Sequence, residues 1–80
     1  MTVEKAKALL LKKYPFRQIV RGCMYKGDYL FVAPDKDLGE FGDMGDPFFI
    51  VKEDGTIKSF VPTMDLKGFS EAMSKHQIEV

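Results

Sequence analysis

The sequence predicts a single α+β domain with one helix near each end of the chain and four antiparallel strands between them. Three observations lead to this fold class. Apolar residues recur at helical spacing in the first and last parts of the chain, short aromatic and β-branched runs fill the middle, and glycine-containing turns separate those runs. Because 80 residues can close only one hydrophobic core, we expect one domain over residues 1–80.

The first helix is expected over residues 3–13. Its apolar residues fall on one side at helical spacing and its lysines on the other, as in an amphipathic surface helix. Thr2 is the expected N-cap, and Glu4 in the first turn suits the helix dipole. The helix should end before Pro15, because proline disfavours helical geometry at Tyr14.

Four strands are expected in the middle of the chain, and tight turns join them in pairs. The turn Lys26-Gly27-Asp28 closes a first hairpin, and Glu53-Asp54-Gly55 closes a second with its Asp-Gly signal. Pro34 and Pro62 end the second and fourth strands, because proline cannot donate to a sheet ladder. The expected strands are residues 17–25, 29–33, 47–52 and 56–61.

The second helix is expected to begin after Asp65, which is well placed as its N-cap. Gly68 should weaken this helix by about 1 kcal/mol relative to alanine. Residues 77–80 alternate in character and predict an additional edge strand. The residues expected on one apolar face of the helix are Leu66, Phe69, Ala72, Met73 and His76.

These elements predict the order α-β-β-β-β-α, with the strands forming a four-stranded antiparallel meander. We expect both helices to pack on one face of the sheet, with Leu10 and Phe69 buried there together, and the other face left to solvent or a partner. In residues 48–51 both faces are apolar, so alternation does not decide which side chains point inward.

Composition restricts where the chain works. No tract of about 18 apolar residues is present, so the sequence predicts no membrane span, and the apolar run at residues 8–11 is too short for a signal-peptide core. Cys23 is the single cysteine and can form no internal disulfide. We therefore expect a cytoplasmic protein, in the host cytoplasm if a phage encodes it.

The residues do not form a recognisable catalytic or cofactor motif, so we expect no enzyme and no cofactor. Cys23 and His76 are the one conceivable nucleophile and base, yet neither lies in a catalytic motif. Cys23 is instead expected to be a small core or sheet residue, and His76 to lie on the last helical turn. The glycines at positions 39, 42 and 45 do not precede the lysine-serine pair of a phosphate loop.

Residues 35–46, called here the acidic segment, raise the question of calcium. Asp35 and Asp37 match the first ligand positions of an EF-hand loop, but Glu40 stands where that loop needs glycine, and strands rather than helices flank it. We therefore expect no metal site.

The acidic segment is the candidate partner-binding site, although it also reads as a solvated loop. Phe41 and Met44 stand among acids and glycines, where they either fold back onto the core or form an apolar anchor inside a charged rim. The candidate partner-binding residues are Asp35, Asp37, Glu40, Phe41, Asp43, Met44 and Asp46.

Charge is distributed unevenly along this chain of zero net charge. Residues 1–26 carry seven basic side chains against Glu4 alone, and residues 27–56 carry eight acids against two lysines. The basic part suggests nucleic-acid binding through phosphate contacts, which the zero net charge disfavours. A solvated helix face explains the same lysines.

A resemblance to a known family rests on turns and strands. The run Gly45-Asp46-Pro47, the strand Phe48-Phe49-Ile50-Val51 and the turn Lys52-Glu53-Asp54-Gly55 resemble a signature of small bacterial immunity proteins of the YrhB type. Similar sequences accompany phage and prophage head genes, and they share the leading helix, the cysteine-bearing strand and the Tyr29-Leu30-Phe31-Val32 strand. The tryptophan common in such proteins is absent here. The resemblance implies a non-enzymatic partner protein and no particular functional residues.

The sequence therefore predicts a small protein-interaction module, encoded by a phage, prophage or other mobile element, whose partner is another protein. Its acidic segment and an open sheet face would make the contact. The first alternative is an immunity protein that blocks a toxin with acidic side chains, and the second is a nucleic-acid-binding accessory protein that uses the basic helix and first strand.

Overall fold

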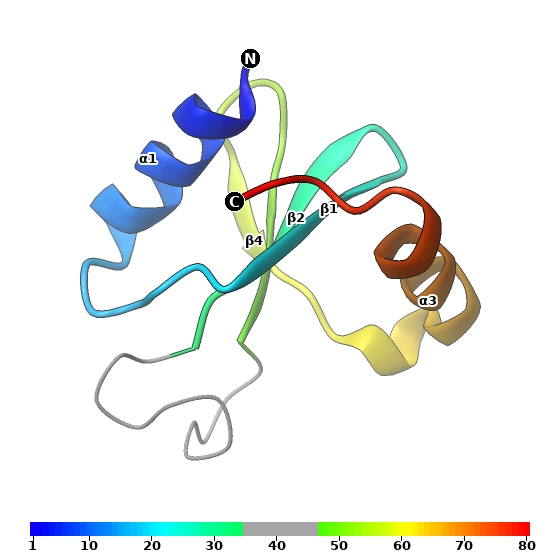
Figure 1. The fold of residues 1–80 in the computed structure, drawn as a ribbon. Helices are drawn as coiled ribbons and strands as arrows, with labels where there is room; N and C mark the ends of the chain where they lie inside the picture. Colours follow the sequence, from blue (N-terminus) through cyan, green and yellow to red (C-terminus); the bar gives the residue numbers. More distant parts are fainter. Residues whose placement is uncertain (35–46) are drawn as a thin grey trace.

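The computed structural model describes residues 1–34 and 47–80, and these residues form two helices around a four-stranded sheet (Figure 1). The element order and the α+β class agree with the sequence prediction. The elements are α1 (Val3–Lys13), β1 (Arg21–Tyr25), β2 (Asp28–Val32), β3 (Phe48–Val51), β4 (Ile57–Ser59), the short 3-10 helix η1 (Pro62–Met64) and α3 (Leu66–Lys75).

The sheet is the predicted antiparallel meander, with strand order β1-β2-β3-β4. Lys26 and Gly27 form the first turn with φ of 48° and 82°, the left-handed geometry that a two-residue hairpin needs. Gly55, with φ of 90°, supplies the left-handed residue of the second turn. The strands are shorter than predicted, because only residues 21–25 of the first segment and 57–59 of the last form ladder pairs.

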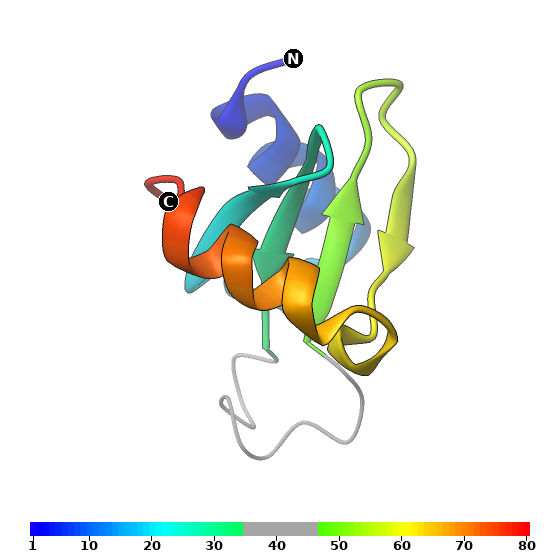
Figure 2. The same cartoon turned by 90° about the vertical axis from the view of Figure 1, so that its right-hand side faces the viewer.

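The two helices lie on opposite faces of the sheet, so the prediction that both pack on one face is wrong (Figures 1 and 2). The physical reason is visible in β3, whose side chains alternate between the faces. Phe49 and Val51 belong to the α1 side, and Phe48 and Ile50 to the α3 side. With both faces apolar, packing both helices on one face would leave the other set of side chains in water.

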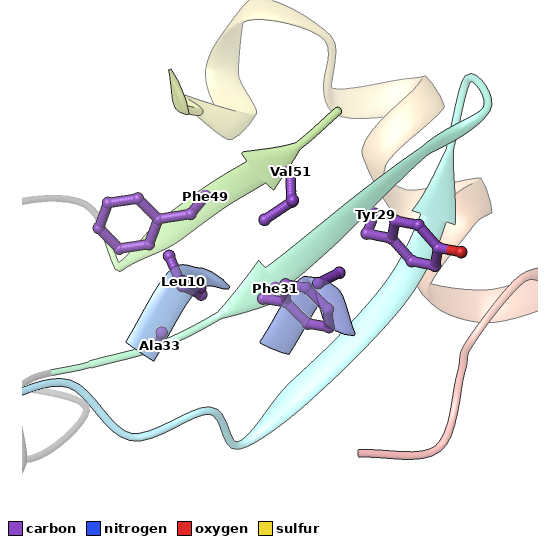
Figure 3. Close-up of a cluster of buried hydrophobic side chains, with 7 residues drawn as sticks. Leu10, Tyr29, Phe31, Ala33, Phe49 and Val51 are labelled. Carbon is purple, nitrogen blue, oxygen red and sulfur yellow. The ribbon is translucent and has the colours of Figure 1, made fainter. Parts of the chain in front are cut away.

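The layer under α1 is a closed hydrophobic core (Figure 3). Leu10 from the helix and Phe31 and Val51 from the sheet are fully buried. The ring centroid of Tyr14 lies 4.9 Å from that of Phe49, and the Tyr29 hydroxyl donates to the Met1 carbonyl at 2.6 Å. Burial of this whole set holds α1 in place, because the helix itself contributes few polar contacts to the sheet.

The layer under α3 is smaller and richer in aromatic pairs. Its buried residues are Cys23, Tyr25, Leu30, Phe60 and Ala72. Phe69 contacts two further rings, Phe48 edge-on at 5.2 Å between centroids and Phe60 at 5.9 Å. Leu66 and His76, expected on the same apolar face of this helix, are exposed because they lie at its two ends. Phe69, Ala72 and Met73, which pack in the α3 layer, lie between them.

A polar cluster joins the start of α3 to the first hairpin. Asp65 caps the helix by accepting from the Gly68 N–H at 3.1 Å, as predicted, and it also accepts from the Tyr25 hydroxyl at 2.6 Å. Lys26 lies 3.3 Å from the same carboxylate. The hydrogen bond from Tyr25 lowers the pKa of Asp65 below its ordinary value, and it raises the pKa of Tyr25.

The chain after α3 returns along the outer edge of β1, but it forms only an isolated bridge between Gln77 and Cys23 and not the predicted edge strand. The Met24 N–H donates to the His76 carbonyl and the Ile78 N–H to the Gly22 carbonyl, both at 3.0 Å. Gly22 allows this close approach, since a Cβ there would lie 2.9 Å from the Phe31 ring.

Within residues 1–34 and 47–80, no helix has both the length and the apolar character needed to cross a membrane.

Candidate functional site

An open groove lies beside α3, at the edge of the sheet surface that this helix covers. Ladder pairing places Arg21 opposite Val32 and Val32 opposite Phe48, so these three residues form one row across β1, β2 and β3. The neighbouring row on the same face, Cys23 and Leu30 with their β3 partner, lies under α3. The first row therefore extends beyond the helix and forms the floor of the groove.

The wall of the groove comes from α3 itself. Phe69 and Met73 are four residues apart, so they lie on one side of the helix. The cavity volume is about 440 Å³. We call it the α3 groove, and its lining residues are Arg21, Val32, Pro47, Phe48, Phe69 and Met73.

Among the described residues, five of the six that line the groove are apolar, and Arg21 is the charged one. Phe48, Phe69 and Met73 are only half-buried, so their outer surfaces face the groove. Such a combination, with apolar side chains open to one side and a cation at the rim, is typical of sites that bind an apolar anchor of another molecule.

A second apolar surface lies on the segment that leads into α3. Val61, Met64 and Leu66 are exposed, with Met64 at 81 % and Leu66 at 63 %. The Met64 N–H donates to the Val61 carbonyl at 3.0 Å, which holds this segment in a defined turn. Leu66 was expected on the apolar face of the second helix, and its exposure corrects that prediction.

All seven residues predicted to bind a partner, Asp35, Asp37, Glu40, Phe41, Asp43, Met44 and Asp46, lie outside the described residues. The described chain resumes at Pro47, which lines the α3 groove. The open sheet face that was expected to contribute to the contact is absent, because α3 covers one face and α1 the other. Within the described sheet, the row at the floor of the α3 groove corresponds best to that expectation.

Cys23 and His76 do not form a catalytic pair in the part of the chain that the structure describes. Cys23 is fully buried in the α3 layer, as predicted, and this burial raises the pKa of its thiol to about 11. His76 is exposed and contacts β1 through its backbone carbonyl. Across residues 1–34 and 47–80, no three His, Cys, Asp or Glu side chains cluster as a metal site would require.

The basic side chains of residues 1–26 do not gather into one surface. Lys7 donates to the Val80 carbonyl, Arg17 to the Ala33 carbonyl, and Lys26 pairs with Asp65. Lys12 is exposed on α1, whereas Arg21 lines the groove on the opposite face of the sheet. This arrangement gives less support to phosphate binding along a basic stripe than the sequence alone suggested.

Sequence reasoning missed the α3 groove, although part of its signal was present. The Phe-Phe-Ile-Val run is apolar on both faces, which is typical of a strand covered on both sides. The register that aligns Arg21 with Val32 and Phe48 depends on how β1 pairs with β2 and β2 with β3, so it could not be derived from local patterns.

Comparisons of the whole chain with protein-family models, with curated proteins and with solved structures found no match.

Proposed function

We propose that this chain is a non-enzymatic protein-interaction module that binds a partner protein through the α3 groove. The observation that supports the proposal is the groove itself, in which Phe48, Phe69 and Met73 surround an open hollow of about 440 Å³. The proposal replaces the open sheet face of the sequence prediction with this narrower surface. The phage or mobile-element origin and the immunity-protein alternative stay predictions of the resemblance, and the neighbouring genes would test them.

The energetic reason is the removal of apolar surface from water. Phe69 and Met73 are half-buried, and a side chain inserted between them and Phe48 would cover the rest. Each Å² of apolar surface covered contributes about 25 cal/mol, before the costs of association. Fully desolvated apolar contacts at the centre of an interface supply most of its affinity, so one anchor side chain in the groove would dominate binding.

Contacts among its own residues hold the groove wall in place before any partner arrives. The edge-on contact between Phe48 and Phe69 fixes one ring against the other, and Phe60 supports Phe69 from the side. Asp65 ties the first turn of α3 to Tyr25 of the hairpin. A preformed site loses little conformational entropy on binding, which favours affinity.

Site-specific photo-crosslinking in cells that naturally make the chain tests this proposal. A photoreactive phenylalanine derivative replaces Met73 in the groove wall, and the same derivative at the adjacent exposed residue Ser74 is the matched control. We expect a discrete protein adduct from position 73 and none from position 74. The partner identified in this way must then bind the purified chain.

The affinity between the purified chain and its purified partner provides the decisive measurement. Met73→Glu places a charge in the groove wall and should abolish binding, whereas Ser74→Glu adds the same charge one residue away and should leave it unchanged. A partner that binds Met73→Glu as tightly as the parent chain would contradict the proposal, provided that circular dichroism shows the variant to be folded.

A further inference from the structure

We infer that the α3 groove selects a protein segment that carries an apolar anchor residue and a carboxylate one to three residues away from it. This inference rests on the proposed function and names the chemistry of the partner. The anchor would occupy the space between Phe48, Phe69 and Met73, and the carboxylate would pair with Arg21.

The spacing follows from the row that forms the floor of the groove. Arg21, Val32 and Phe48 occupy matched positions on three adjacent strands. Neighbouring strands lie about 4.8 Å apart, so the backbones at Arg21 and Phe48 are about 10 Å apart. An extended segment advances about 3.3 Å per residue, and the arginine side chain can shorten the gap. A carboxylate one to three residues from the anchor therefore meets the guanidinium.

The charge of Arg21 is available to a partner. Among the described residues, Arg21 forms no ion pair and its side chain no hydrogen bond, unlike Lys26 and Lys52, which both pair with aspartates. Glu79 lines a neighbouring hollow together with Arg21, but the structure gives no ion pair between these two residues. A guanidinium with free donors beside an apolar surface favours a carboxylate, which can accept two parallel hydrogen bonds.

Side chains, and not added backbone pairing, must carry the recognition. At the floor of the groove the Val20 N–H donates to the Val32 carbonyl, the Ala33 N–H to the Pro47 carbonyl and the Phe60 N–H to the Phe48 carbonyl. The central strands of the meander also have partners on both sides. A bound segment therefore gains specificity from its anchor and its charge, which makes the sequence of the segment predictable.

A random peptide library displayed on phage tests the inference with the purified full-length chain. We expect the selected peptides to share a large apolar residue with Asp or Glu one to three positions away. Selection against Arg21→Gln should keep the apolar residue and lose the acid. Lys12→Gln removes an exposed positive charge from the α1 side and is the matched control, which should select the same peptides as the parent.

The affinities of one selected peptide for the parent chain and its variants then measure the ion pair between Arg21 and the acid of the peptide. Arg21→Gln should weaken binding about tenfold, the range expected for a hydrogen-bonded ion pair. Replacing the acid of the peptide by its amide should weaken binding to the parent chain by a similar factor and should leave binding to Arg21→Gln nearly unchanged, because the two changes remove the same interaction.

Four results would overturn the inference. Peptides that bind the groove without any acid, or an Arg21→Gln variant with parental affinity, would leave the proposed function intact and reject the partner chemistry. Peptides that bind equally well to Met73→Glu would instead reject the groove and the proposed function together. A chain with Phe41→Ser and Met44→Ser that binds the peptides at least about tenfold more tightly would assign the groove to the chain's own acidic segment.

Discussion

The two side-chain layers that flank the sheet are built from similar residues but differ in how completely they are closed. Under α1, Leu10, Phe31 and Val51 are fully buried, and partly buried residues from both ends of the chain surround them. Under α3, Phe48, Phe69 and Met73 remain half-buried beside an open groove. The α1 layer is therefore closed, whereas the α3 layer leaves apolar surface open to solvent, where we propose that a partner binds.

The helices are also held differently. α1 is held by burial of Ala6 and Leu10, with the ring of Tyr14 packed on Phe49. α3 has one fully enclosed apolar contact in Ala72 and relies further on the Asp65 cluster at its first turn. A helix fixed at one end by polar contacts can leave the side of its middle turns open, and this geometry produces the groove.

The largest expected effect comes from shortening a side chain in the closed layer. Leu10→Ala should lower the free energy of unfolding by about 2–5 kcal/mol, because it leaves a cavity among fully buried neighbours. Met73→Ala should cost only about 1 kcal/mol, since its side chain already borders open space. Urea unfolding followed by circular dichroism measures both values. Equal losses would show that the two layers are equally closed.

A smaller effect is expected when a side chain is enlarged in each layer. Gly22→Ala should cost about 1–3 kcal/mol, because its new Cβ would lie 2.9 Å from the fully buried Phe31 ring and 3.0 Å from Val80. Hydrogen exchange at Ile78 should accelerate as the last residues separate from β1. Met73→Phe in the open groove should change stability by less than about 0.5 kcal/mol. If Gly22→Ala leaves the free energy of unfolding unchanged and Met73→Phe lowers it, the α1 layer is not the more closed of the two.

The smallest expected effect concerns the polar anchor of α3 and depends on pH. The pKa of Asp65 is lower in the folded chain than its ordinary value of about 3.9, chiefly because Tyr25 donates a hydrogen bond to the carboxylate. The ionised group therefore stabilises the fold above about pH 4, and this contribution disappears as the pH falls through the folded pKa. Asp65→Asn should be less stable than the parent at about pH 7.

The difference between these two chains should be smaller at about pH 2.5 than at about pH 7, because the Asp65 carboxylate becomes protonated as the pH falls through its folded pKa. Unfolding free energies at the two pH values measure this convergence. A difference of the same size at both values would mean that Asp65 acts only as a neutral cap. Tyr25→Phe, which removes the hydroxyl but keeps the ring in the α3 layer, should reproduce part of the loss at about pH 7.

Local patterns predicted most of the secondary structure. Residues 3–13 form α1 with Thr2 as its cap, and Asp65 caps α3, because capping and helical periodicity depend only on neighbours in sequence. The turns at Gly27 and Gly55 were found for the same reason, since left-handed backbone there favours glycine. The ends of the strands were less accurate, because pairing partners decide where a ladder stops.

The predicted placement of both helices on one face of the sheet was wrong because β3 is apolar on both faces, and each face needs a helix to cover it. Leu66 and His76 fit the helical stripe of Phe69, yet they lie at the ends of α3 and are exposed. The candidate binding site also differs: the sequence indicated the acidic segment, and the structure indicates the α3 groove. The acidic segment drew attention through its composition, whereas Arg21 stood out only once its row with Val32 and Phe48 was known.

The sequence by itself determined the elements of this protein, their order, their caps and their turns, because each depends on chemistry within a few residues. Only the tertiary structure decided that α1 and α3 cover opposite faces and that Arg21, Phe48 and Met73 meet beside α3. These relations depend on strand register and on how two helices share one sheet. Both are set by the combined burial of side chains far apart in the chain, which no local pattern contains.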